Sequence, residues 1–192
     1  MKKSNIRRKD LTQIFSLLII IFLLLFVNHN CSYAQETYVK STEIKCENII
    51  VQIKTQCLNE SEGPFPYCVS QEILLTSAND ARSIRIPASG QLILIKENNK
   101  SIRILDVLVS AIACVKGYKK SYLIIGYYTG GNCDECEWDE IFDLDGNKLA
   151  SSRKIKGLEG SYEKFNKTYE ELGLPKKWPR SLFVDVNLMK DK

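Results

Sequence analysis

The chain has 192 residues and a formal net charge of +4. Residues 1–34 hold five of the 27 basic residues and one of the 23 acidic residues, so residues 35–192 carry 22 of each sign. That balance argues against a nucleic-acid-binding protein, because such proteins neutralise phosphates with an excess of lysine and arginine. The single histidine, His29, also lies in residues 1–34. A Ser-His-Asp triad, a Cys-His pair and a histidine-ligated zinc site are therefore excluded from residues 35–192.

The N-terminal segment has the pattern of an export signal. Residues 2–9 are basic, residues 14–27 are apolar apart from one serine, and Ser32-Tyr33-Ala34 offers small residues before a cleavage point. The apolar run of 14 residues is shorter than the roughly 20 residues of a membrane-spanning helix. We therefore predict a cleavable signal peptide at residues 1–34 and a single disulfide-stabilised domain at residues 35–192. The protein would be periplasmic or secreted and would meet the membrane only in transit; a retained N-terminal membrane anchor is the alternative.

An even number of cysteines in an exported chain predicts disulfides. The six cysteines of residues 35–192 are Cys46, Cys57, Cys68, Cys114, Cys133 and Cys136. Two β-rich runs, residues 48–56 and 68–76, are separated by a loop with glycine and prolines, and pairing them as a hairpin places Cys57 opposite Cys68. Cys133 and Cys136 are predicted to form a local clip. Cys46–Cys114 then follows by elimination.

The Cys133–Cys136 pair has a second interpretation as a thiol–disulfide exchange site. Such a site lowers the pKa of one thiol, usually at the N-terminus of a helix. Here the motif follows two glycines and leads into a strand-like segment, and the charges of Asp134, Glu135 and Glu137 should raise the thiol pKa values. A structural clip is therefore favoured. A zinc site of four thiolates would need two further cysteines brought to the motif.

Strand-like runs recur through the middle of the chain. Residues 91–96 and 101–105 flank a short polar loop and predict a hairpin. Residues 102–115 and 122–129 predict a second hairpin that turns near Gly117. Residues 102–115 are long enough to hold two strands or one bent strand, and periodicity alone also allows a buried helix.

The dipeptide Asp145-Gly146 between two alternating runs predicts a type I′ hairpin turn. That turn would place Asp143 opposite Lys148 as an ion pair. It would also place Phe142 opposite Leu149 on the apolar face.

The last third of the chain changes to helical spacing. The helix would begin near Ser161 and end before Gly173, and residues 181–187 could add one more strand. Its apolar stripe is formed by Tyr162, Phe165, Tyr169 and Leu172. The fold predicted for the whole is mainly β: a single antiparallel domain of about eight or nine strands, sandwich or barrel-like, with one C-terminal amphipathic helix.

A dense acidic cluster lies around the predicted hairpin. Its members are Asp134, Glu135, Glu137, Asp139, Glu140, Asp143 and Asp145. A solvated strand face, with charges that protect a sheet edge, is the favoured interpretation. A cation-binding module using Asp139, Asp143 and Asp145 is an alternative, although the loop lacks the glutamate that an EF-hand has at its twelfth position. Glu137 and Asp139, about 7 Å apart on one strand face, also have the carboxylate separation of an inverting glycosidase.

These observations favour a non-catalytic binding protein over an enzyme, since residues 35–192 hold no phosphate-binding loop, HExxH or GxSxG motif. We expect its partner to be another protein, as for an inhibitor or an immunity-type protein, with no cofactor, no metal and an unassigned oligomeric state. The alternatives are thiol–disulfide exchange at Cys133 and Cys136 and the cation-binding module. The expected binding loop, pre-organised by the Cys133–Cys136 clip, contains Thr129, Asn132, Asp134, Glu135 and Trp138.

Overall fold

The computed structural model describes residues 36–59, 66–77, 83–87, 90–97, 100–131, 133, 135–154, 161–175, 182–186 and 188. The chain forms two compact units, residues 1–35 and residues 36–192, and the second contains every described residue. The predicted signal peptide lies outside the described residues, as do Asn132 and Asp134 of the expected binding loop.

The described residues form eleven strands and one helix. In chain order they are β1 (Thr37–Cys46), β2 (Ile49–Leu58), β3 (Cys68–Ser77), β4 (Ser83–Ile86), β5 (Leu92–Glu97), β6 (Lys100–Leu105), β7 (Leu108–Lys116), β8 (Ser121–Tyr128), β9 (Glu137–Phe142), β10 (Lys148–Ser151), α2 (Ser161–Glu171) and β11 (Val184–Asp185).

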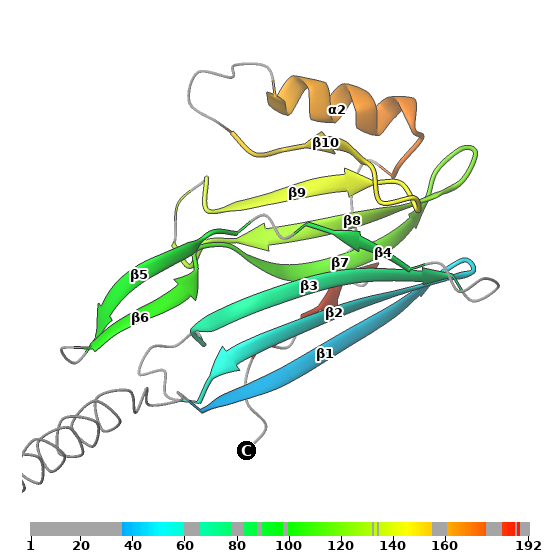
Figure 1. Ribbon diagram of the computed structural model, residues 1–192. Coiled ribbons are helices and arrows are strands. Elements are labelled where there is room, and N and C mark those ends of the chain that lie inside the picture. Colours follow the sequence, from blue (N-terminus) through cyan, green and yellow to red (C-terminus); the bar gives the residue numbers. More distant parts are fainter. Residues whose placement is uncertain are drawn as a thin grey trace, which may run out of the picture. The chain divides into compact units, whose positions relative to one another are not determined.

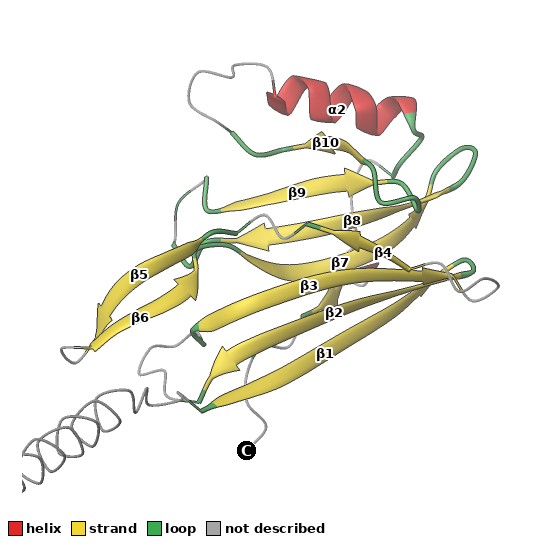
Figure 2. Cartoon of the chain, viewed as in Figure 1, coloured by secondary structure: helices red, strands yellow, loops and turns green. Residues whose placement is uncertain are grey.

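The strands form three antiparallel sheets. The first sheet has the order β1-β2-β3-β4, the second has the order β10-β9-β8-β7-β11, and β5 and β6 form a separate hairpin (Figures 1 and 2). The first and second sheets pack face to face, and α2 lies against β10 on the outer side of the second sheet (Figure 1). The prediction of a mainly β, antiparallel fold with one helix near the C-terminus is confirmed, and the fold is sandwich-like rather than a barrel. The run 102–115 holds two strands, β6 and β7, separated near Val107.

Three disulfides tie the sheets and loops together, and they are the three pairs expected from the sequence. Cys57–Cys68 joins the ends of the neighbouring strands β2 and β3, where the two residues are register partners. Cys46–Cys114 links the first sheet to the second across 68 residues of chain. Cys133–Cys136 closes the turn between β8 and β9. Disulfides of this kind are compatible with an exported protein.

The interior of the sandwich combines an apolar core with one buried polar link. Val51, Ile53 and Ile73 of the first sheet pack against residues of the second sheet such as Leu123. Gln71 on β3 is also buried, and its amide spans the two sheets. The N–H of Val109 donates to Gln71 Oε1 at 2.6 Å, and Gln71 Nε2 donates to the carbonyl oxygen of Val109 at 3.3 Å. A β-bulge between Val109 and Ala111 interrupts the ladder of β7 and frees these backbone groups.

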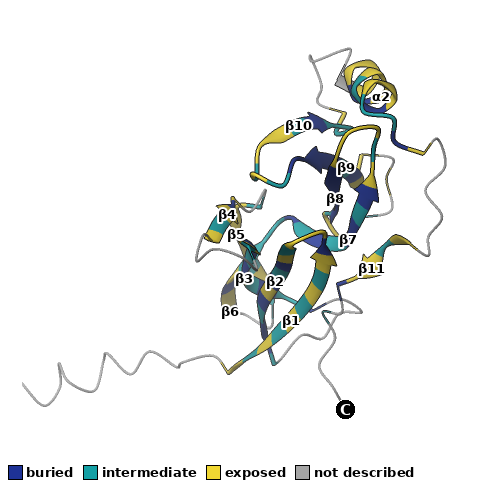
Figure 3. Cartoon of the chain, turned by 90° about the vertical axis from the view of Figure 1, so that its right-hand side faces the viewer, coloured by how far each residue is buried: buried dark blue, intermediate teal, exposed yellow. Residues whose placement is uncertain are grey.

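β8 is buried along almost its whole length because it is covered on both faces (Figure 3). One face belongs to the sandwich core, and on the other face Tyr122 and Ile124 pack under α2. The sequence of β8 is therefore a continuous apolar run rather than an alternating one. Phe165 and Tyr169 of α2 supply the covering side chains. Leu172 is half-buried, whereas Tyr162 is 52% exposed and contributes little to the predicted stripe.

The helix ends in a glycine C-cap. Gly173 has a φ of +70°, a conformation that glycine adopts without steric cost. Its N–H donates to the carbonyl oxygen of Glu170, and the N–H of Leu174 donates to that of Tyr169. This pair of hydrogen bonds is the Schellman motif, which ends the helix where the glycine predicted it would end.

The turn between β9 and β10 differs from the predicted type I′ turn. Only Gly146 has a positive φ, of 81°, whereas a type I′ turn needs two such residues. The Asp143 carboxylate instead organises the turn, because its Oδ1 accepts the N–H groups of Asp145 at 3.0 Å and Asn147 at 2.9 Å. Lys148 therefore pairs with Phe142, and the predicted partners Asp143–Lys148 and Phe142–Leu149 were wrong.

The expected C-terminal strand is short. β11 contains only Val184 and Asp185, which pair with Ile112 and Ala111 of β7. β11 is an edge strand of the second sheet, and it places Asp185 beside Ala111.

Candidate functional site

The outer face of the second sheet divides into two halves. In the half under α2, Ala113, Ile124 and Ile141 lie on three adjacent strands and are fully buried. Side chains two residues apart on a strand share a face. The next row on the same face is therefore Ala111 on β7, Gly126 on β8 and Asp139 on β9.

This next row continues onto β11 and is not apolar. Ala111 pairs with Gly126 and with Asp185, and Gly126 pairs with Asp139, so the four residues form one line across four strands. Two carboxylates therefore flank two of the smallest residues. With neighbouring strands about 4.8 Å apart, the Cα atoms of Asp139 and Asp185 are separated by roughly 14 Å.

A cavity of about 580 Å³ lies over this row, within the size range of small-molecule sites. None of the described residues that line it belongs to α2. We call this cavity the acidic trough. It is lined by Ser110, Ala111, Gly126, Tyr127, Glu137, Trp138, Asp139, Ser152, Phe183 and Asp185.

The floor of the acidic trough exists because its residues are small. A Cβ atom placed on Gly126 would lie 3.3 Å from Asp139 Oδ1 and 3.6 Å from both Ala111 Cβ and Ser110 Oγ. The carboxylate of Asp139 thus lies over the glycine. A glycine inside a strand often marks a close approach of this kind.

Asp139 is held by its backbone and leaves its carboxylate available. Its N–H donates to Ser152 Oγ and its carbonyl oxygen accepts the N–H of Ser152, both at 2.8 Å. Within the described residues the carboxylate forms neither a hydrogen bond nor an ion pair. Burial raises the pKa of Asp139, and the neighbouring charge of Glu137 raises it further. Burial and the charge of Asp139 also raise the pKa of Tyr169 on α2.

The acids of the β9–β10 hairpin have a different environment. Glu140 is 4% exposed and lies 3.3 Å from Lys148 Nζ. Burial alone would raise the pKa of Asp143, but hydrogen bonds from Asn147, the charge of Lys120 and the N–H of Asp145 hold it below its ordinary value. The interpretation of the acidic cluster as a solvated strand face was wrong for Glu140 and Asp143, which are buried. Glu135, Glu137 and Asp145 are exposed, as that interpretation expects.

The expected binding loop is only partly exposed. Thr129 and Glu135 are exposed. Trp138 was placed wrongly, since it is 4% exposed and stacks on Tyr127 with ring centroids 5.4 Å apart. The guanidinium carbon of Arg153 lies 4.2 Å from the centre of the tryptophan ring. The buried tryptophan therefore packs at the start of β9 and borders the acidic trough from within the core.

The loop nevertheless borders the acidic trough. Cys133 is exposed and Cys136 is buried, and Cys136 directly precedes the trough residue Glu137. The N–H of Thr129 donates to the carbonyl oxygen of Cys136 at 3.0 Å, and the N–H of Cys136 donates to that of Cys133 at 3.0 Å. The clip therefore fixes the end of the β8–β9 pair at which the trough lies.

The three aspartates of the expected cation module do not converge. Asp139 lies in the trough, whereas Asp143 directs both carboxylate oxygens to its own turn, with Asn147 Nδ2 donating to Oδ2 at 3.0 Å. In the described part of the chain, no group of three or more histidine, cysteine, aspartate or glutamate side chains is arranged to hold a metal ion. None of the described helices has the length and apolar character needed to span a membrane.

Most of the trough was not predicted from the sequence. Glu137, Trp138 and Asp139 were singled out, but Asp185 was not, and Ala111 and Gly126 were assigned no role. The one local signal was the glycine in the middle of a strongly apolar strand.

The fold and the trough define a disulfide-stabilised β-sandwich with one outer helix. No family model matches the chain. No curated protein and no solved structure matches it either.

Proposed function

We propose that the protein is an exported, non-catalytic binding protein that recognises another protein through the acidic trough, as an inhibitor or an immunity-type protein does. One observation carries the proposal: within the part of the chain that the structure describes, no helix covers half of one sheet face, and a cavity there holds the Asp139 carboxylate, which has no hydrogen-bond or ion-pair partner. Elsewhere on that face, apolar side chains are buried under α2. Binding sites are typically concave, with a small number of polar groups that fix the orientation of the ligand.

Export is supported by two independent features. The first is the signal-peptide pattern of residues 1–34. The second is the pairing of all six cysteines of residues 35–192 in disulfides, which persist in oxidising compartments. A periplasmic or secreted location follows from the proposal.

The exposed residues of the Cys133–Cys136 loop would form one rim of the binding surface. Thr129 and Glu135 lie on this loop, and the disulfide limits its conformations before a partner arrives. Such pre-organisation lowers the entropy cost of association.

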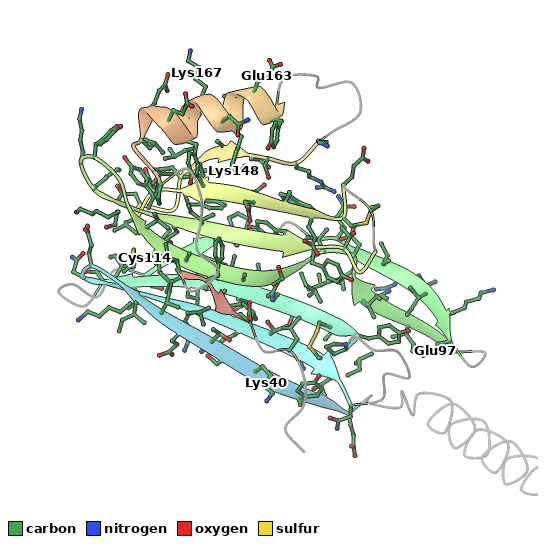
Figure 4. All side chains as sticks on the ribbon, turned by 180° about the vertical axis from the view of Figure 1, so that it is seen from behind. Lys40, Glu97, Cys114, Lys148, Glu163 and Lys167 are labelled. Carbon is green, nitrogen blue, oxygen red and sulfur yellow. A yellow bond between two sulfur atoms is a disulfide. The ribbon has the colours of Figure 1, made fainter. Side chains whose placement is uncertain are left out.

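The proposal is tested by cross-linking and affinity capture from the envelope fraction of the producing cells. The wild type is compared with Ala111→Leu, which fills the trough floor, and with Glu163→Gln, an exposed position on the outer side of α2 (Figure 4). We expect one partner to be captured by the wild type and by Glu163→Gln and to be lost with Ala111→Leu. Equal capture by all three forms would refute the trough as the binding surface.

Thiol–disulfide exchange at Cys133 and Cys136 is the second candidate function. The observation that favours it is the exposure of Cys133 beside the buried Cys136, because an exchange site needs one sulfur within reach of an attacking thiolate. The reduction potential of this pair decides between the two functions. A structural clip is expected below about −300 mV, and an exchange site well above that value.

A further inference from the structure

We propose that the acidic trough receives a long basic side chain, lysine or arginine, presented by the partner protein. This inference rests on the proposed function and names the chemistry that the trough recognises. It is carried by the placement of three carboxylates around one cavity, none of which forms an ion pair with a described lysine or arginine.

The described residues supply no ion pair for the carboxylates of the trough. Glu137, Asp139 and Asp185 line it, and none of them forms an ion pair with another described residue. By contrast, the hairpin acids Glu140 and Asp143 each have a lysine within 4 Å. Of the three, Asp139 is half-buried, whereas Glu137 and Asp185 are exposed. A half-buried carboxylate without a counter-ion is unfavourable, and a ligand cation would relieve that cost.

The shape of the trough suits an extended side chain. Its floor is formed by Ala111 and Gly126, and carboxylates lie on the strands at both ends of the row. Phe183 adds an apolar wall, against which the methylene groups of a lysine or arginine can pack. The hydroxyl of Ser152 lies beside Asp139 at the β9 end of the row, and Phe183 lies at the β11 end together with Asp185.

Titratable groups around Asp139 make binding depend on pH. Glu137 lies on the same strand, Tyr169 faces it from α2, and Asp185 lies across the floor on β11. The raised pKa of Asp139 means that protons compete with the cation over a higher pH range than for an ordinary aspartate. Affinity should fall as the pH drops through the pKa of Asp139 and should recover when the pH is raised again.

The test uses the intact, disulfide-bonded protein and small probes. Binding of n-butylguanidinium and n-butylammonium is followed by NMR, with n-butanol as the uncharged control. We expect millimolar binding of both cations, no binding of the alcohol, and at least a tenfold loss with Asp139→Asn. Glu163→Gln, which lies on the outer side of α2, should bind as the wild type does. Unchanged binding by Asp139→Asn would overturn the inference.

Partner capture separates this inference from the proposed function. If Ala111→Leu abolishes capture while Asp139→Asn leaves it intact, the trough remains the binding surface and the basic side chain is refuted. Loss of capture with both variants supports both statements, and retention with both refutes both. The last experiment measures the binding of spermidine, a free polyamine. Micromolar binding would show that the cation comes from a small molecule, and it would overturn the assignment to a protein side chain.

Discussion

The two halves of the outer face of the second sheet are built from the same strands but differ in the side chains they carry and in what covers them. Under α2, Ile124 and Ile141 are buried in one apolar cluster with Phe165 and Tyr169. One row further along, the same strands carry glycine and aspartate. The covered half stabilises the fold, whereas in the open half the Asp139 carboxylate has no ion-pair or hydrogen-bond partner among the described residues. Such a departure from the packing rules within one sheet face is typical of a functional site, where polar groups are placed for a ligand and not for the stability of the fold.

The largest expected change in the free energy of unfolding comes from a substitution in the covered half. Ile124→Ala removes a side chain that is 0% exposed, and it should lower the free energy of unfolding by about 3 kcal/mol through lost burial and a new cavity. Ser110→Ala, in the open half, should change it by less than about 0.5 kcal/mol. Urea unfolding of the two variants measures both values. Equal losses would show that the trough is part of the structural core.

The next largest effect on stability is expected at Asp143, whose carboxylate organises the turn between β9 and β10. Asp143→Asn removes the charge that faces Lys120 and weakens the hydrogen bonds of the turn, and it should cost about 1 kcal/mol at neutral pH. The pKa of Asp143 is lowered from 3.8 in the folded protein. Its contribution is therefore present above pH 3.8 and is lost as the pH falls through the lower, folded pKa. Thermal unfolding at a series of pH values should show the difference shrinking in acid.

The smallest expected effect is an increase, not a decrease, in the free energy of unfolding. Asp139→Asn removes a carboxylate whose pKa is raised by burial and by Glu137, and it should stabilise the protein at neutral pH by about 0.5 kcal/mol, the scale of a like-charge contact. Because the folded pKa exceeds the ordinary value of 3.8, the cost of Asp139 is absent below pH 3.8 and grows as the pH rises through the folded pKa. The same melting series, run beside Asp143→Asn, checks the sign. Destabilisation at neutral pH would mean that the carboxylate has a structural role.

Much of the fold can be predicted from the sequence because the sequence signals for its elements are local. Alternating runs, the prolines between β2 and β3, and Gly173 after an apolar stripe each specify an element within a few residues. The cysteine pairs follow from those elements. The turn at Asp145-Gly146 failed because its geometry is decided by the side chain of Asp143, which offers the backbone a different set of hydrogen bonds.

The trough could not be predicted in the same way, since it is assembled from distant parts of the chain. Asp185 reaches Ala111 only through the two-residue strand β11. The row also depends on the bulge between Val109 and Ala111, which decides which side chains of β7 face outward. Neither the pairing nor the bulge has a local sequence signature. Asp139 was singled out as one acid among seven, and only the structure separates it from the hairpin acids.

The central claim is that the acidic trough holds a carboxylate in need of a cation, and the pKa of Asp139, measured by carbon-13 NMR with and without n-butylguanidinium, tests it most directly. We predict a pKa above that of an ordinary aspartate in the free protein, because of burial and Glu137, and a lower pKa once the cation is bound. A pKa at or below the ordinary value, unmoved by the cation, would contradict the account.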